Sequence, residues 1–254
     1  MSGAADTVNP VLLDEAARLA ELADERGARM RLFGGVGIRM LLGPRMPAAL
    51  RRESDDLDYL IDRGSLRTVE ELLEDAGWRG DREFNALNGA RRLIFHDPGA
   101  GNKIDVFVES FEMCHTLPLA ERMEVTARTL PAAELALTKL QVVTLNRKDQ
   151  GDLYALFAGL PVADHDEDAI NAARIAELAA RAWGLHHTLE LNLGRLREGL
   201  GESPLEAGER EAVDAGIDAV AAAMEAAPKS RGWRLRARIG ERKQWYELPE
   251  EVDR

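Results

Sequence analysis

The segment GGVGIRMLLGPRMPAALRRESDDLDYLID, residues 34–62, decides the fold, because it opens with two glycines and ends with acids inside an apolar run. Asp56 and Asp58 flank Leu57 in what we expect to be a strand. Side chains alternate along a strand, so both carboxylates point to the same face. Two carboxylates about 7 Å apart on one face repel each other. A divalent cation, which prefers oxygen ligands, removes that repulsion.

A third acid lies in a later apolar run, KIDVFV, residues 103–108. If this segment forms a strand beside residues 56–61, Asp105 completes a three-acid cluster. An Asp-x-Asp pair alone is most often a solvated strand face, so its combination with the glycines matters. Backbone amides at a glycine turn before a helix bind phosphate, and three acids can hold two Mg²⁺ ions for attack on a phosphate.

Composition predicts a soluble globular protein of 254 residues, 45% hydrophobic and 31% charged. The net charge of −12 argues against general attraction to nucleic acid or to an anionic membrane. The N-terminus does not resemble a signal peptide, and no apolar run is long enough to cross a membrane. The single cysteine, Cys114, fits a reducing compartment. We therefore expect a cytoplasmic protein with no membrane partner.

Hydrophobic periodicity predicts three regions. An α/β domain over residues 1–130 contains helices at 11–26, 36–42 and 65–76, and strands at 31–33, 56–61, 91–96 and 103–108. A helical domain over residues 131–228 contains helices at 131–146, 149–157, 166–197 and 208–226. A basic and aromatic tail follows over residues 229–254.

The order of these features resembles the nucleotidyltransferase superfamily with the DNA polymerase β-like fold. Its signature is a hydrophobic residue, Gly-Gly or Gly-Ser, a spacer, Asp-hydrophobic-Asp and a third Asp on a later strand. The counterparts here are Phe33-Gly34-Gly35, Asp56-Leu57-Asp58 and Asp105. The resemblance implies an α/β (α+β) N-terminal domain with a mixed sheet, followed by a helical domain. It also implies that Gly34 and Gly35 bind the phosphates of an NTP and that the three acids hold two Mg²⁺ ions.

The spacer resembles one branch of that superfamily. Twenty residues separate Gly35 from Asp56, and they end in Arg52-Glu53-Ser54-Asp55. A long spacer with this ending is similar to the toxin-type enzymes of abortive-infection type IV toxin–antitoxin systems. The resemblance implies that Arg52 and Ser54 contact the phosphates or support the loop, and that a cognate antitoxin is a partner.

A motif in the second half resembles the same branch. Lys139 is followed by Arg147, Asp149 and Asp152, similar to a helical Lys … Arg-x-x-Asp-x-x-Asp-Leu pattern, although Asp149 follows Arg147 by two residues instead of three. Asp149 and Asp152 share a helix face, which Lys139 reaches only if the helix bends or breaks near Asn146. The resemblance implies that Lys139 neutralises triphosphate charge, and that Asp149 or Asp152 orients Lys139 or binds the acceptor. An amphipathic helix with an exposed Lys139 and a capping Asp149 is the alternative.

The tail carries seven basic residues and one acid between Lys229 and Gln244. Apolar residues at every second position from Trp233 to Ile239 predict a strand, with a hairpin turn at Gly240-Glu241. Its arginine face is either solvated or binds RNA or an acidic partner, with aromatic residues stacking on bases.

Together these features predict a Mg²⁺-dependent, toxin-like nucleotidyltransferase. The acceptor hydroxyl, on tRNA or protein, loses its proton near Asp105 and attacks the α-phosphorus of an NTP, expelling pyrophosphate. Two alternatives stay open: an enzyme of the aminoglycoside-modifying type with a small-molecule acceptor, and a non-catalytic nucleotide-binding or regulatory module. The presence of all three acids argues against the second alternative.

Overall fold

The computed structural model describes residues 10–54, 56–99 and 101–248. The chain divides into two compact units. The first, here called the sheet unit, comprises the described residues of 1–43, 51–111 and 118–130. The second, here called the helical unit, comprises the described residues of 44–50, 112–117 and 131–254.

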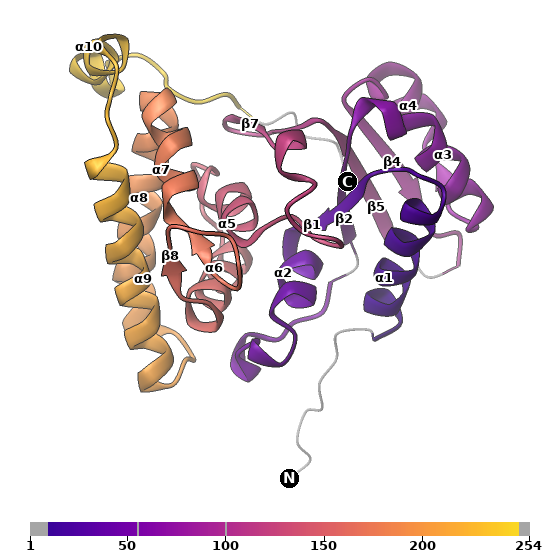
Figure 1. The fold of residues 1–254 in the computed structure, drawn as a ribbon, viewed down its shortest axis with the longest axis horizontal. Helices are drawn as coiled ribbons and strands as arrows, with labels where there is room; N and C mark the ends of the chain where they lie inside the picture. Colours follow the sequence, from indigo (N-terminus) through magenta and orange to yellow (C-terminus); the bar gives the residue numbers. More distant parts are fainter. Residues whose placement is uncertain (1–9, 55, 100, 249–254) are drawn as a thin grey trace. The chain divides into compact units, whose positions relative to one another are not determined.

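A five-stranded mixed sheet organises the sheet unit, with strand order β1-β2-β5-β4-β3 (Figure 1). Its strands are β1 (Met30–Phe33), β2 (Asp56–Ile61), β3 (Arg79–Gly80), β4 (Arg92–His96) and β5 (Lys103–Val108). The central pair, β2 and β5, is parallel, while β1 with β2, β4 with β5 and β3 with β4 are antiparallel. The mixed sheet in an α/β arrangement confirms the predicted fold class.

Four helices belong to this unit: α1 (Pro10–Glu25), α2 (Gly34–Leu42), α3 (Leu66–Asp75) and α4 (Arg82–Asn88). Leucines and alanines of α1 and α3 form the hydrophobic core with one face of the sheet, to which Leu57, Tyr59, Ile104 and Val106 contribute. The Tyr59 hydroxyl, buried in this core, donates to the carbonyl of Ala16 at 3.1 Å.

The other face of the sheet carries the acids. Residues that pair across neighbouring strands point to the same side. One row across four strands therefore contains Phe33, Asp58, Asp105 and Ile94. Alternation along β2 and β5 thus separates an apolar face, covered by α1 and α3, from a face that bears carboxylates.

The helical unit is built from α5 (Ala132–Leu140), α6 (Arg147–Gly159), α7 (Ala172–Arg181), α8 (Trp183–Gly199), α9 (Ala207–Ala226) and α10 (Arg231–Ile239). Two-stranded sheets pair β6 (Ser110–Glu112) with β7 (Thr116–Pro118), and β8 (Val162–Ala163) with β9 (Ile170–Asn171). Short 3-10 helices occur in both units: η3 (Arg63–Ser65) and η4 (Ala120–Arg122) belong to the sheet unit, η2 (Ala48–Leu50), η5 (Leu200–Glu202) and η6 (Gly240–Arg242) belong to the helical unit, and η1 (Gly43–Arg45) spans the division between them. A buried ion pair between Arg174 and Glu134, at 3.0 Å, joins α7 to α5.

The predicted hairpin in the tail is wrong, because residues 231–239 form the helix α10. Ser230 caps this helix by accepting the Trp233 amide at 3.0 Å. Trp233 packs inward and donates from its indole to the carbonyl of Ala179 at 3.1 Å, whereas Leu235 and Ile239 are 63% and 41% exposed. Apolar residues stand at every second position from 233 to 239, but only Trp233 and Ala237, which are four residues apart and share a helix face, are partly buried.

Two predicted helices are also shorter than expected. The helix predicted over 131–146 ends at Leu140, because Asn146 caps a new helix, α6. The helix predicted over 166–197 begins at Ala172 and divides at Ala182 into α7 and α8. Helix α4 and strand β3 were not predicted from the sequence, since each is too short to show a periodic pattern.

Candidate active site

Asp58 and Asp105 are direct partners in the register of the two central parallel strands. Neighbouring strands lie about 4.8 Å apart, so the two side chains are neighbours on one face. Asp105 is buried, with 3% of its surface exposed, and Asp58 is half-buried. Asp56 lies two residues before Asp58 on the same face and is the register partner of Lys103.

The backbone of Gly34 lies directly against the carboxylate of Asp58. Its φ is +67°, a backbone conformation that side chains disfavour. A Cβ atom at this position would lie 2.0 Å from Oδ2 of Asp58, so the glycine allows the backbone to approach the carboxylate. Helix α2 begins at Gly34 without a side-chain cap. Its first N–H groups form the positive end of a helix dipole, which suits an anion.

Two cations neutralise the carboxylate of Asp105. Arg92 donates to Oδ1 from Nε at 3.0 Å and from Nη2 at 2.7 Å. The Lys103 ammonium lies 2.9 Å from Oδ2 of Asp105 and 4.0 Å from Oδ1 of Asp56. The Arg92 guanidinium also lies over the ring of Phe107, 4.9 Å from its centroid. Asp105 therefore has both oxygens engaged by positive charge.

The carboxylates offer the ligand type that Mg²⁺ prefers. Within residues 10–54, 56–99 and 101–248, however, no group of three or more His, Cys, Asp and Glu side chains is arranged to hold a metal ion. Asp105 is turned toward Arg92 and Lys103 in this arrangement. Asp56, Asp58 and Asp105 suit a divalent cation, because all three are carboxylates on one face of the sheet. The ammonium of Lys103 lies between the carboxylates of Asp56 and Asp105, where it supplies a positive charge. The shared site of three acids stays a prediction.

The spacer residues hold the backbone at the entrance to β2. The Ser54 hydroxyl donates to the carbonyl of Asp56 at 3.3 Å, and Arg52 donates to the carbonyl of Glu53 at 3.4 Å. Asp55, the residue between them and the strand, lies outside the described residues. Phosphate contact and support of the loop both stay predictions for Ser54 and Arg52.

The second predicted motif comes together within the helical unit. The chain breaks between α5 and α6, and the Lys139 ammonium contacts Asp149 Oδ1 at 2.7 Å and Asp152 Oδ2 at 3.3 Å. Asn146 caps α6 by accepting the Asp149 amide at 2.9 Å, and its own amide donates to Asp149 Oδ2 at 2.7 Å. The side chain of Lys139 is only 16% exposed, so the alternative of a solvated lysine with a capping Asp149 does not hold.

Sequence reasoning missed the cations Arg92 and Lys103. Lys103 precedes Asp105 by two residues, so strand alternation already places both on one face. Arg92 is different, because its contact with Asp105 depends on the register of the antiparallel pair β4 and β5, in which Arg92 is the partner of Phe107. That register cannot be read from either strand alone.

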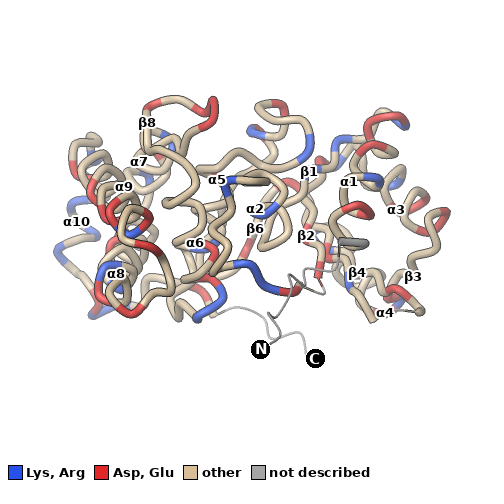
Figure 2. Tube along the Cα trace, turned by 90° about the horizontal axis from the view of Figure 1, so that it is seen from below, with Lys and Arg blue, Asp and Glu red and all other residues tan. Residues whose placement is uncertain are grey.

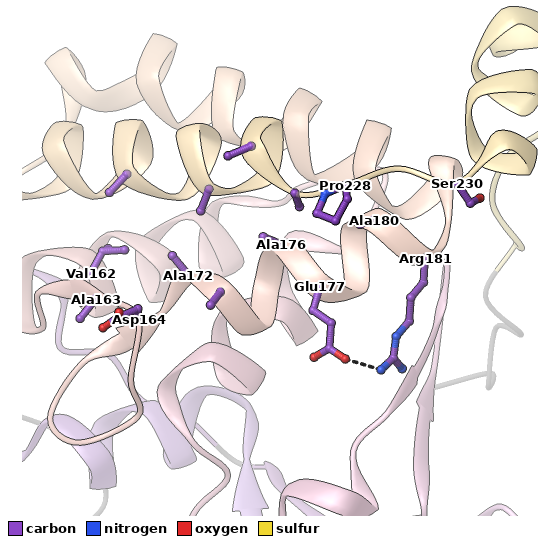
Figure 3. A pocket seen from close by; sticks show the side chains of 15 residues that line it. Val162, Ala163, Asp164, Ala172, Ala176, Glu177, Ala180, Arg181, Pro228 and Ser230 are labelled. Atoms are coloured by element: carbon purple, nitrogen blue, oxygen red, sulfur yellow. Dashed lines mark hydrogen bonds and ion pairs between the residues drawn. The ribbon is translucent and has the colours of Figure 1, made fainter.

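A groove of about 950 Å³ opens in the helical unit (Figure 3). Alanines, most of them on α7 and α9, form most of its lining, and Glu177 and Arg181 form an ion pair at its edge. Among the residues that the structure describes, those lining the groove include none of the residues predicted from the sequence. Its lining is mainly small and apolar, with few side chains that could act as acids, bases or ligands.

The family of the chain follows from its sequence. A family described as uncharacterised nucleotidyltransferase matches residues 2–142, more than half of the chain. The chain belongs to this family of nucleotidyltransferases, and is accordingly a transferase. A search of curated proteins gave no match.

Two solved structures are similar to the chain at low identity. The antibiotic-resistance factor ANT(2'')-Ia is 14% identical, with 86% of this chain and 97% of that chain covered and a TM-score of 0.36. The STING-associated CdnE c-di-GMP synthase from Capnocytophaga granulosa is 12% identical, with 86% and 82% covered and a TM-score of 0.29. Within the described residues, no helix is long and apolar enough to span a membrane.

Proposed function

We propose that the chain transfers a nucleoside monophosphate from an NTP to an acceptor hydroxyl. The observation that carries this proposal is the position of Asp58: it is the register partner of Asp105 on one side, and the backbone of Gly34 lies against its carboxylate on the other. An anion-binding helix start and paired carboxylates meet at this residue, as attack on a bound phosphate requires.

Each group has a distinct task in this reaction. The backbone N–H groups of Gly34 and Gly35 bind the triphosphate at the start of α2. Asp56, Asp58 and Asp105 hold Mg²⁺, which supplies charge neutralisation for the phosphates when it is bound. The acceptor hydroxyl loses its proton to solvent near Asp105, and its oxygen forms a bond to the α-phosphorus. The bond from that phosphorus to the bridging oxygen breaks, and pyrophosphate leaves.

We propose RNA as the acceptor, in keeping with the toxin-type resemblance. Support comes from α10, whose basic positions are blue in Figure 2 and which carries exposed arginines in a protein of net charge −12. These are Arg231, Arg234 and Arg238, followed directly by Arg242 and Lys243. Clustered exposed cations bind phosphate backbones with little regard to sequence.

The test is label transfer from each of the four α-³²P NTPs, with Mg²⁺, to total bacterial RNA and protein. Wild type should label a band of RNA, and Asp58→Asn should label none, because the asparagine cannot carry the metal's countercharge. Label on protein alone would refute RNA as acceptor and keep the reaction class. Label on neither, with transfer to an aminoglycoside, would establish the small-molecule alternative.

A toxin-like role has its own test in cells. Induced expression of the wild type should stop growth, whereas Asp58→Asn at equal protein level should not. Rescue by a neighbouring gene product would identify the antitoxin. Growth that is unaffected by an active wild-type enzyme would contradict the toxin role and leave the transferase proposal intact.

A further inference from the structure

Lys103 occupies an unusual position in the candidate site. Its ammonium lies between two of the proposed metal ligands, 2.9 Å from Asp105 and 4.0 Å from Asp56. Lys103 is the register partner of Asp56, and it shares a strand face with Asp105. A single positive charge therefore already sits where a cation bridging these carboxylates would bind.

The two cations around Asp105 differ in how firmly they are held. Arg92 makes two bonds to one oxygen of Asp105 and lies over the ring of Phe107. A planar guanidinium in a fork-like contact and on an aromatic face is fixed in orientation. Lys103 makes one close contact to the other oxygen, with Asp56 farther away at 4.0 Å, and its ammonium ends a flexible four-carbon stem. Of the two, Lys103 is the one that can leave.

We propose that Lys103 is an exchangeable counter-ion of the site. In the absence of a divalent cation, its ammonium neutralises Asp56 and Asp105. When the divalent cation binds, Lys103 gives up these carboxylates and its ammonium turns to the triphosphate. This inference rests on the proposed function, because it assumes that the acids bind a metal and that the site binds an NTP.

The physical reason is charge balance. Arg92 and Lys103 bring two positive charges against the carboxylates of Asp105 and Asp56. A divalent cation added with Lys103 in place would face a neighbouring positive charge, which weakens its binding. An ammonium that has been displaced is a compact, strongly charged donor, suited to phosphate oxygens.

The proposal predicts opposite effects of one substitution on two ligands. Lys103→Met should tighten Mn²⁺ binding by about five- to tenfold, because a competing charge is removed from the carboxylates. The same substitution should weaken the binding of an NTP analogue in the presence of saturating Mn²⁺ by about tenfold, because a phosphate contact is lost. A residue that merely supported the structure would weaken both.

The experiment measures Mn²⁺ binding by electron paramagnetic resonance of the free ion. It also measures binding of the four α,β-methylene nucleoside triphosphates by equilibrium dialysis. Lys103→Gln serves as a second variant if Lys103→Met unfolds, and Lys103→Arg, which keeps the charge, should leave Mn²⁺ affinity near wild type. Arg67→Met is the matched control for net charge, since Arg67 is exposed on α3, which covers the opposite face of the sheet. It should change neither affinity.

Unchanged or weaker Mn²⁺ binding by Lys103→Met and Lys103→Gln, with wild type binding Mn²⁺ normally, would overturn the inference alone. Tighter Mn²⁺ binding without weaker binding of the analogue would overturn the second half, the transfer of Lys103 to the phosphates. Failure of the wild type to bind Mn²⁺ or any analogue would overturn the proposed function and the inference with it.

Discussion

At the scale of single residues, Gly34 is the most constrained position of the candidate site. Alanine there would combine an unfavourable φ of +67° with a Cβ atom 2.0 Å from the Asp58 carboxylate. We predict that Gly34→Ala costs about 1–3 kcal/mol in the free energy of unfolding and lowers transferase activity by more than about 100-fold, because the acid must move. Urea unfolding and label transfer measure the two effects.

Gly27→Ala is the matched control for that change. Gly27 has nearly the same backbone angle, a φ of +70°, but nothing lies within 4 Å of its added Cβ. This variant should lose similar backbone stability and keep its activity. Equal loss of activity in both variants would show that strain, and not the approach to Asp58, explains the result.

His115 in the helical unit predicts a dependence of stability on pH. Burial lowers the pKa of His115 from its usual value of 6.5 to about 4, and its Nε2 lies 2.8 Å from the hydroxyl of the buried Thr188. The folded state therefore binds fewer protons than the unfolded state between these two pH values. The contribution of the neutral ring is fully present above pH 6.5 and is lost as the pH falls toward 4.

Urea unfolding at pH 7 and at pH 4.5 measures this effect. Wild type should lose about 1–2 kcal/mol from this ring, after allowance for its partial exposure. His115→Gln should reduce the dependence by this amount, leaving the part from His186, whose pKa burial also lowers, and His165→Gln, at an exposed histidine, should leave the dependence unchanged. A wild-type slope retained in His115→Gln would refute the assignment.

At the scale of elements, the sequence predicted the strands whose limits are set by their own local pattern of side chains. The bounds of β2 and β5 were predicted residue for residue, because each is a mainly apolar run of six residues in which strand alternation places the acids on one face. The acids were found by the same alternation. Their cations were found only in the structure, since the contact of Arg92 depends on the pairing of β4 with β5.

Helix α10 shows where local patterns fail. Alternation of apolar and arginine residues fits a strand by period, but arginine, leucine and alanine favour helix, and Ser230 supplies a cap. Contacts far along the chain decide the outcome: Trp233 bonds to Ala179, and the Arg236 guanidinium lies 4.4 Å from the ring centroid of Trp183. Arg236 is thus used in packing, while its arginine neighbours are exposed.

The exposed arginines of α10 should contribute to RNA affinity. We predict that replacing Arg231, Arg234 and Arg238 together with glutamine weakens RNA binding at least about tenfold and lowers the slope of log affinity against log salt by about 2. Fluorescence anisotropy with labelled RNA at several salt concentrations measures both. The matched control replaces three exposed arginines of the sheet unit, Arg67, Arg79 and Arg82. Equal losses in both triple variants would refute a specific role of α10.

At the scale of the whole molecule, the family match covers all of the first motif but only part of the second. The family match ends at residue 142. It includes the acids, the glycines and Lys139, while Asp149 and Asp152, which contact Lys139, follow after its end. The reaction class therefore rests on residues 2–142. The net charge of −12 describes the whole chain and does not indicate the local basic surface of α10.

The central claim is that Asp58 serves the transfer of a nucleotidyl group, and one measurement tests it most directly. NTP labelled at the α-phosphorus and NTP labelled at the γ-phosphorus are each incubated with the protein, Mg²⁺ and acceptor RNA. Wild type should transfer the α label and release the γ label as pyrophosphate, and Asp58→Asn should do neither. Transfer of the γ label to the acceptor, or full activity of Asp58→Asn, would contradict the account.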